Sequence, residues 1–160
     1  SRQNPLMRGV NSAFLAVLAC TAQAQPAPVE IALQVGATKY QFSGNAECKA
    51  APQASIYGIS ASLYSVTHSA GEQSLHLTLW QPKTGAPDMM TLTVSNRSNR
   101  YEVDTVKGGN KRDTKGSGKT TVEKSGAGGV FKVEAVAAKG EKISGTIKCA
   151  RFSGVQAEGG

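Results

Sequence analysis

Residues 119–152, KTTVEKSGAGGVFKVEAVAAKGEKISGTIKCARF, decide the fold class of this chain. Two glycine-containing breaks divide the stretch into three short segments, residues 119–124, 130–137 and 143–152. In the last segment Ile143, Ile147 and Cys149 share one face, because side chains alternate along a strand. The stretch therefore predicts three β-strands, of which the last directs a cysteine towards a core.

The rest of the chain shows the same strand-like alternation. Three leucines alternate with polar or aromatic residues in residues 74–81, which is the most regular strand pattern in the protein. Residues 50–53 contain Pro52 and are predicted to form a loop. The other predicted strands cover residues 30–35, 39–48, 56–68, 90–94 and 101–105.

These patterns predict an all-β protein. We expect about eight to nine short strands in an antiparallel β-sandwich or small barrel, because no amphipathic helix of useful length is present after the N-terminal region. The 18 glycines suit a fold with many turns. A chain of 160 residues has the length of one domain, and it contains no internal repeat.

The N-terminal region has the pattern of an export signal. Arg2 and Arg8 precede the apolar run 13–19, and the Ala-Gln-Ala of residues 22–24 matches a signal-peptidase site. The apolar run is too short to span a bilayer as a stable helix. We therefore expect a bacterial protein that is periplasmic or secreted.

Two cleavage positions are open. Cleavage after Ala24 would leave a soluble protein that begins at Gln25, whereas cleavage before Cys20 at a weak lipobox would leave a lipid anchor on that cysteine. The expected boundaries are a signal peptide at 1–24 with an upstream extension at 1–6, a Pro/Ala spacer at 25–28, a single β domain at 29–154 and a disordered tail at 155–160.

Cys48 and Cys149 are the two cysteines of the expected mature domain. Cys48 shares its strand face with Tyr40 and Phe42, so it also points inward. An oxidising compartment favours pairing the two cysteines in a disulfide, and the alternative is two separate buried thiols. Neither cysteine has a ligand-spaced partner, so we expect no metal site.

A basic, glycine-rich segment at residues 107–119 is a candidate anion- or polyanion-binding loop. Backbone amides in such a loop can bind anions, and clustered cations attract polyanions. The alternative is a solvated hairpin loop. The segment does not match a phosphate-binding P-loop, because Asp113 stands where the first glycine is required. Its candidate residues are Lys107, Lys111, Arg112, Lys115 and Lys119.

His76 and Trp80 share the face of residues 74–81 opposite the leucines, and they form a candidate interaction face. The alternative for Trp80 is a residue that caps a small β core. We expect both histidines, His68 and His76, to be ordinary surface or half-buried residues. No catalytic arrangement of serine, histidine, cysteine and acidic residues is recognisable, so we expect no enzyme activity and no cofactor.

Three short motifs resemble small exported bacterial proteins of uncharacterised function. They are YQFSGNAEC at residues 40–48, LTLW at 77–80 and GTIKC at 145–149. The layout of the chain is also similar to that of the mycobacterial 19-kDa lipoprotein antigen family, in which an exported β domain ends in a strand that carries a cysteine. The resemblance implies no catalytic residues.

The leading functional hypothesis is a non-catalytic, exported binding protein of the bacterial envelope, whose partner is a protein or an envelope polymer. One alternative is a polyanion-binding module that uses residues 107–119. Another alternative is a small exported inhibitor of a hydrolase such as lysozyme.

Overall fold

The computed structural model describes residues 26–111 and 113–154. Within these ranges the protein is all-β and contains no helix, as predicted. The strands are β1 (Ala27–Val35), β2 (Thr38–Ile56), β3 (Ile59–Ala70), β4 (Gln73–Pro82), β5 (Met89–Asn96), β6 (Asn99–Asp104), β7 (Ser117–Ser125), β8 (Gly128–Val136), β9 (Lys142–Cys149) and β10 (Ser153–Gly154).

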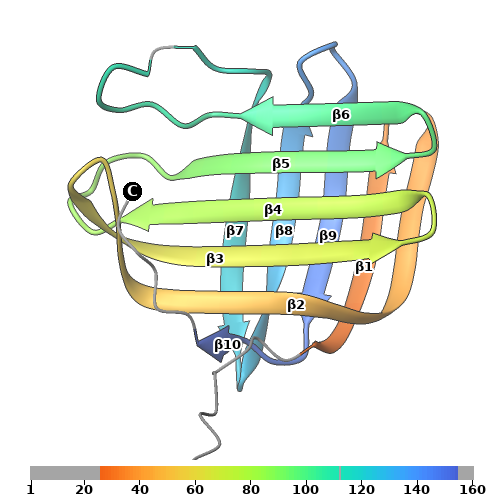
Figure 1. Cartoon of the computed structure of the whole chain (residues 1–160), viewed down its shortest axis with the longest axis horizontal. Helices are drawn as coiled ribbons and strands as arrows, with labels where there is room; N and C mark the ends of the chain where they lie inside the picture. Colours follow the sequence, from red (N-terminus) through yellow and green to blue (C-terminus); the bar gives the residue numbers. More distant parts are fainter. Residues whose placement is uncertain (1–25, 112, 155–160) are drawn as a thin grey trace, which may run out of the picture.

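Nine of these strands form a nearly closed antiparallel barrel. The strand order is β6-β5-β4-β3-β2-β1-β9-β8-β7, and only the short β10 pairs in parallel, with β2. The first half of β2 pairs with β1 and its second half pairs with β3, so β2 belongs to both sides of the barrel. Figure 1 shows β2–β6 as one layer in front of a second layer formed by β1, β9, β8 and β7.

The barrel is closed between β6 and the second layer by a few specific contacts. The backbones of Asp104 and Lys115 exchange two hydrogen bonds, of 2.8 and 2.9 Å. The backbone amide of Ala138 donates a 2.9 Å hydrogen bond to the carbonyl of Glu102. Inside the barrel, the hydroxyl of Thr120 on β7 lies 3.3 Å from the sulfur of Met90 on β5. These contacts link the two edges of the sheet, β6 and β7. In a fully closed barrel a continuous ladder of hydrogen bonds would pair these edges.

The core contains the inward-facing half of nearly every strand. The alternation predicted for residues 74–81 is confirmed, because the three leucines of β4 are at most 1% exposed. The aromatic rings of Tyr64, Phe131 and Phe152 meet at the centre of one end, with ring centroids 5.5–5.9 Å apart. Burying such side chains supplies most of the favourable free energy of folding.

The predicted disulfide is confirmed. Cys48 on β2 and Cys149 on β9 are bonded, with their Cα atoms 6.2 Å apart. Both cysteines are buried, and their strands flank β1 on either side. The bond therefore connects the N-terminal and C-terminal parts of the domain across β1.

Two predicted boundaries differ from the structure. The predicted loop at residues 50–53 is wrong, because β2 continues through Pro52 to Ile56. Pairing between β2 and β3 shifts register between Ala51 and Ala54, and at this irregularity Pro52 does not need to donate a ladder hydrogen bond. At the N-terminal side, β1 begins at Ala27, two residues before the expected start of the domain.

Several predictions lie outside the described residues. They concern the signal peptide, the lipidation of Cys20, Arg112 and the tail at 155–160. Within the described part of the chain, no helix has the length and hydrophobicity needed to cross a membrane.

Candidate functional site

Hydroxyl side chains cover the outer surface of β3, β4 and β5. Antiparallel pairing places Ser65 opposite Thr78 and Thr78 opposite Thr91, so one row of hydroxyls crosses three strands. These side chains alternate with buried residues and therefore point away from the core. The set, which we call the hydroxyl face, consists of Ser65, Thr67, Ser69, Ser74, Thr78, Thr91, Thr93 and Ser95.

His76 lies at the centre of the hydroxyl face. Strand pairing places it between Thr67 on β3 and Thr93 on β5. The hydroxyl of Thr67 lies 3.1 Å from Nδ1 of the ring, and the hydroxyl of Thr78 lies 3.3 Å from Nε2. Because a neutral imidazole has one donor and one acceptor nitrogen, these two contacts hold the ring within the hydroxyl array.

Trp80 lies at one end of the same surface, two residues beyond Thr78 on β4. It is opposite Leu63 on β3 and Met89 on β5. The indole is half-buried and packs against a small second hydrophobic cluster, which consists of Ile56, Ala61, Met89 and Val106. The structure thus places His76 and Trp80 on one outer surface, and Trp80 also contributes to packing there.

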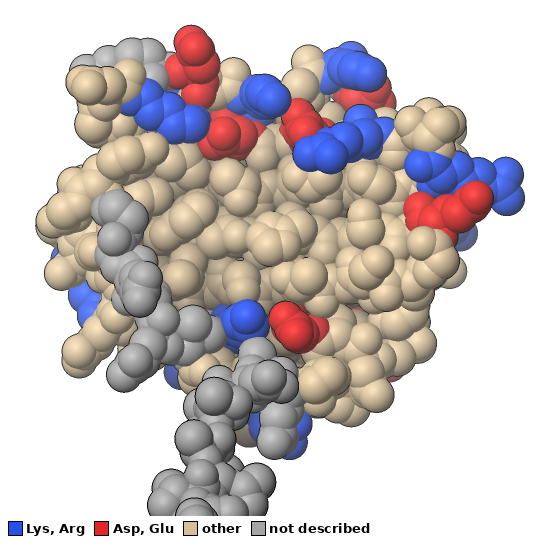
Figure 2. All heavy atoms as spheres, viewed as in Figure 1, with Lys and Arg blue, Asp and Glu red and all other residues tan. Residues whose placement is uncertain are grey.

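Charged side chains lie at the edges of the hydroxyl face, and none lies among its eight residues. On the β2 side, Lys49 lies 3.7 Å from Glu47, and on the β6 side Arg100 lies 2.7 Å from Glu102. Figure 2 shows an uncharged surface over the middle of this layer, with the charged atoms gathered towards its edges. The surface can therefore form many hydrogen bonds but has no charge of its own to attract an ion.

The basic loop is partly neutralised by acidic residues of β6. The Lys111 ammonium lies 3.1 Å from the carboxylate of Asp104 and donates to the carbonyls of Val106 (2.7 Å) and Asp113 (2.9 Å). Lys115 lies 3.0 Å from the carboxylate of Glu102. Both cations are therefore engaged in holding the loop against β6.

The pKa of Glu102 reflects these contacts. Hydrogen bonds from Lys115 and Arg100 lower the pKa of this carboxyl below its ordinary value, because they favour its charged form. Lys107 and Lys119 are exposed, and neither has a carboxylate within 4.0 Å among the described residues. Of the four predicted bases that the structure describes, Lys111 and Lys115 are thus paired with acids, whereas Lys107 and Lys119 are not.

Neither a free thiol nor a candidate metal site is found among the described residues. The disulfide uses both of their cysteines, and no group of three or more His, Cys, Asp and Glu side chains lies close enough to hold a metal ion. The hydroxyls of the hydroxyl face have no adjacent carboxylate–histidine pair to activate one of them.

His68 differs from the expectation of a surface or half-buried residue. It is 2% exposed, because it shares the inward face of β3 with Tyr64 and Val66. Its ring lies against that of Phe42, tilted by 34° with centroids 3.6 Å apart, and neither ring nitrogen has a hydrogen-bond partner among the described residues. Burial lowers the pKa of His68 because it disfavours the charged imidazolium.

The sequence predicted His76 and Trp80 but missed the surrounding hydroxyls. A signal was present, since serine or threonine stands at every second position in residues 65–69 and 91–95. Such alternation also occurs on ordinary solvated strands. Only the strand register shows that the rows continue across β3, β4 and β5 without a charged residue.

Comparison with known proteins gives no match. No protein-family model, no curated protein and no solved structure matches this chain.

Proposed function

We propose that this protein is a non-catalytic, exported binding protein of the bacterial envelope, and that its hydroxyl face binds an uncharged glycan. The observation that carries the proposal is the array of eight serine and threonine side chains around His76, free of charge across three neighbouring strands. The polar groups of a neutral glycan are mainly hydroxyls. A surface with both donors and acceptors can match them without desolvating a charge.

The composition of the hydroxyl face favours a glycan over a protein partner. The cores of protein–protein interfaces are enriched in aromatic residues, methionine and arginine and depleted in serine. The hydroxyl face has the opposite composition, apart from Trp80 at its end. The part of the half-buried Trp80 indole that faces solvent, beside hydrogen-bonding groups, is also suited to packing against the apolar face of a sugar ring.

Charge distinguishes a neutral glycan from a polyanion. Polyanion binding depends on clustered lysine and arginine and weakens steeply with salt. The hydroxyl face contains neither residue, and two lysines of the basic loop are paired with acids. We therefore expect retention on a neutral glycan to be unchanged between about 50 and 200 mM salt.

The experiment is a pelleting assay with two neutral insoluble glycans of different sugar composition, cellulose and chitin, and with purified peptidoglycan, whose stem peptides carry carboxylates, as the charged comparison. Thr78→Glu places a charge at the centre of the hydroxyl face and should weaken binding about tenfold, the effect of losing about 1.4 kcal/mol. Thr146→Glu is the matched control, because Thr146 is also half-buried and outward-facing but lies on β9 in the other layer. It should bind as the unmodified protein does.

Two results would contradict the proposal. One is a failure to pellet with every neutral glycan at low and high salt. The other is an equal loss of binding in both variants, which would show that the effect is not specific to the hydroxyl face. The folded state of each variant is checked by its circular dichroism spectrum.

A further inference from the structure

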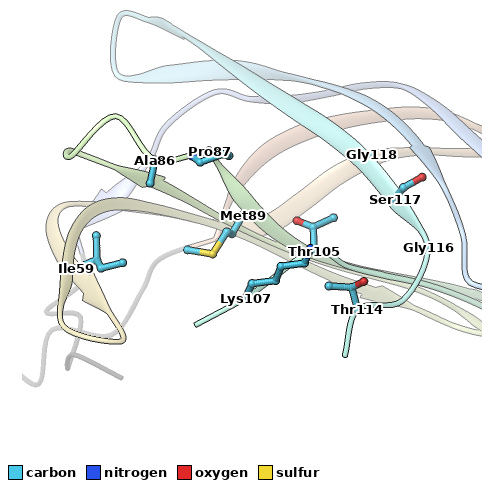
Figure 3. Close-up of a pocket in the computed structure, with 10 residues that line it drawn as sticks. All are labelled: Ile59, Ala86, Pro87, Met89, Thr105, Lys107, Thr114, Gly116, Ser117 and Gly118. Carbon is cyan, nitrogen blue, oxygen red and sulfur yellow. The ribbon is translucent and has the colours of Figure 1, made fainter. Parts of the chain in front are cut away.

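A separate cavity opens at the end of the barrel where β5 and β7 begin (Figure 3). Its volume is 490 Å³, which lies in the range of about 300–1,000 Å³ that is usual for small-molecule sites. It does not include any residue of the hydroxyl face. It is therefore a second candidate site, and its ligand need not be a glycan.

The lining of the cavity is divided between apolar and polar residues. Apolar side chains come from the start of β3, the β4–β5 loop and the start of β5, and they are Ile59, Ala86, Pro87 and Met89. Polar side chains come from the segment between β6 and β7 and from β7 itself, and they are Thr105, Lys107, Thr114 and Ser117. Figure 3 shows Ile59, Ala86 and Pro87 towards one side and Thr114 and Ser117 towards the other.

Gly116 and Gly118 contribute backbone, and no side chain, to the wall of the cavity. Both glycines line it at the start of β7. Their φ angles are +63° and +144°, values that residues with a Cβ atom rarely adopt. A Cβ atom at Gly116 would overlap the carbonyl oxygen of Val136, and one at Gly118 would overlap Ala135. The two glycines are therefore required for close packing against β8, and they contribute only backbone to the wall of the cavity.

Lys107 makes the polar side of the cavity electropositive. Among the described residues no carboxylate lies within 4.0 Å of its ammonium, and no acidic residue lines the cavity. The neighbouring Lys111 and Lys115 differ, because each is paired with an acid on β6. Among the described cations of this loop, Lys107 is thus the one that lines the cavity without an acidic partner.

The hydroxyls on the same side can add to this charge. The Oγ1 of Thr105 accepts a 3.0 Å hydrogen bond from the backbone amide of Met90, which fixes the position of the hydroxyl. Its hydrogen remains able to donate to a ligand. Hydrogen bonds from a cation or a hydroxyl to an anion are roughly twice as strong as those between neutral groups.

We infer that this cavity binds a small single-chain amphiphile with an anionic head group. The alkyl body would lie against Ile59 and Met89, and the head would be held by Lys107 with help from the hydroxyl of Thr105. A carboxylate and a phosphate monoester share the required charge and acceptor atoms. Fatty acids and alkyl phosphates are therefore the two sources of such a ligand.

The test compares ligands that share a ten-carbon chain and differ in the head group: decanoate, decyl phosphate, decanol and decyltrimethylammonium. Binding to the full chain is measured by isothermal titration below the concentration at which each ligand forms micelles. At least one of the two anions should bind about tenfold or more tightly than the cation. Comparing the two anions shows which source of anionic head the site prefers.

Four variants locate the binding. Lys107→Gln should weaken the anion about tenfold and bring it level with decanol, whereas Lys119→Gln, a matched change outside the cavity, should have no effect. Ala86→Trp places a large ring in the apolar part and should abolish binding of every ligand. Thr78→Glu should bind the anion normally, so this inference and the glycan proposal can fail separately.

Several results would overturn the inference. They are equal affinity for the anions and the cation, equal effects of the two lysine substitutions, unchanged binding by Ala86→Trp, and no measurable binding of any ligand. The folded state of each variant is verified by its urea unfolding midpoint. This control separates a filled cavity from an unfolded protein.

Discussion

Replacing His68 with leucine is expected to remove a large part of the pH dependence of stability below about pH 6.5. The imidazole is enclosed by aromatic rings, with Phe42 stacked on it and Tyr40 edge-on at a centroid distance of 6.3 Å. Its strand partner on β4 is Leu75. Burial raises the pKa of Tyr40 to about 12, so Tyr40 stays neutral and supplies no compensating charge.

The direction of the effect follows from proton binding. The folded protein holds the neutral ring, because burial lowers the pKa of His68 below its ordinary value of 6.5. Unfolding exposes the ring to water, where it takes up a proton below about pH 6.5. The unfolded state then binds more protons than the folded state. The stabilisation is therefore complete above pH 6.5 and is lost as the pH falls.

The magnitude has an upper limit set by one proton. The free energy of unfolding should fall by at most about 1.4 kcal/mol for each pH unit below 6.5, until the pKa of His68 in the folded protein is reached. Glu102 does not contribute to the change in the free energy of unfolding just below pH 6.5. Its pKa is lowered from an already acidic value, so its contribution is lost only at lower pH.

The assay is equilibrium urea unfolding at a series of pH values, followed by the fluorescence of Trp80, the single tryptophan. His68→Leu should show a flatter dependence on pH than the unmodified protein. The matched control is His76→Leu, which alters an exposed histidine on the outer face and should keep the slope attributed to His68. An unchanged slope in His68→Leu would refute the reasoning.

Three further predictions concern stability and are measured by urea unfolding. Replacing Cys48 and Cys149 by serine should cost up to about 4.7 kcal/mol, since the bond closes a loop with a sequence separation of 101 residues; a cost near zero would contradict the chain-entropy argument. Gly145→Ala should cost more than about 1 kcal/mol, because φ is +140° and the new Cβ atom would overlap the carbonyl of Ala32; a neutral result would show that β1 and β9 can separate easily. Leu77→Ala should cost about 2–5 kcal/mol, since the side chain is fully buried, and a smaller cost would indicate that the core collapses around it.

Local pattern predicted the fold class and the disulfide correctly for a physical reason. Side chains of a strand alternate between core and solvent, so the position of an apolar residue determines the direction of its neighbours. Cys149 follows Ile143 and Ile147 at even spacing, and Cys48 follows Tyr40 in the same way. Two inward cysteines in one small β core could then meet, and they do.

Local pattern failed where pairing between strands overrides it. Pro52 suggested a loop, but a register shift against β3 accommodates the proline within β2. His68 is polar, yet its place on the inward face of β3 buries it beside Phe42. In both cases the contact that decides the residue's environment comes from another strand, which the local pattern does not contain.

The sequence by itself determined which residues alternate, which cysteines face inward and that the chain forms antiparallel strands. Only the tertiary structure decided what lies side by side. It aligned hydroxyls from β3, β4 and β5 around His76, paired Lys111 and Lys115 with acids of β6, and left Lys107 beside a cavity. The physical reason is that periodicity acts within one strand, whereas a binding surface depends on the register between strands and on the loops that close the barrel.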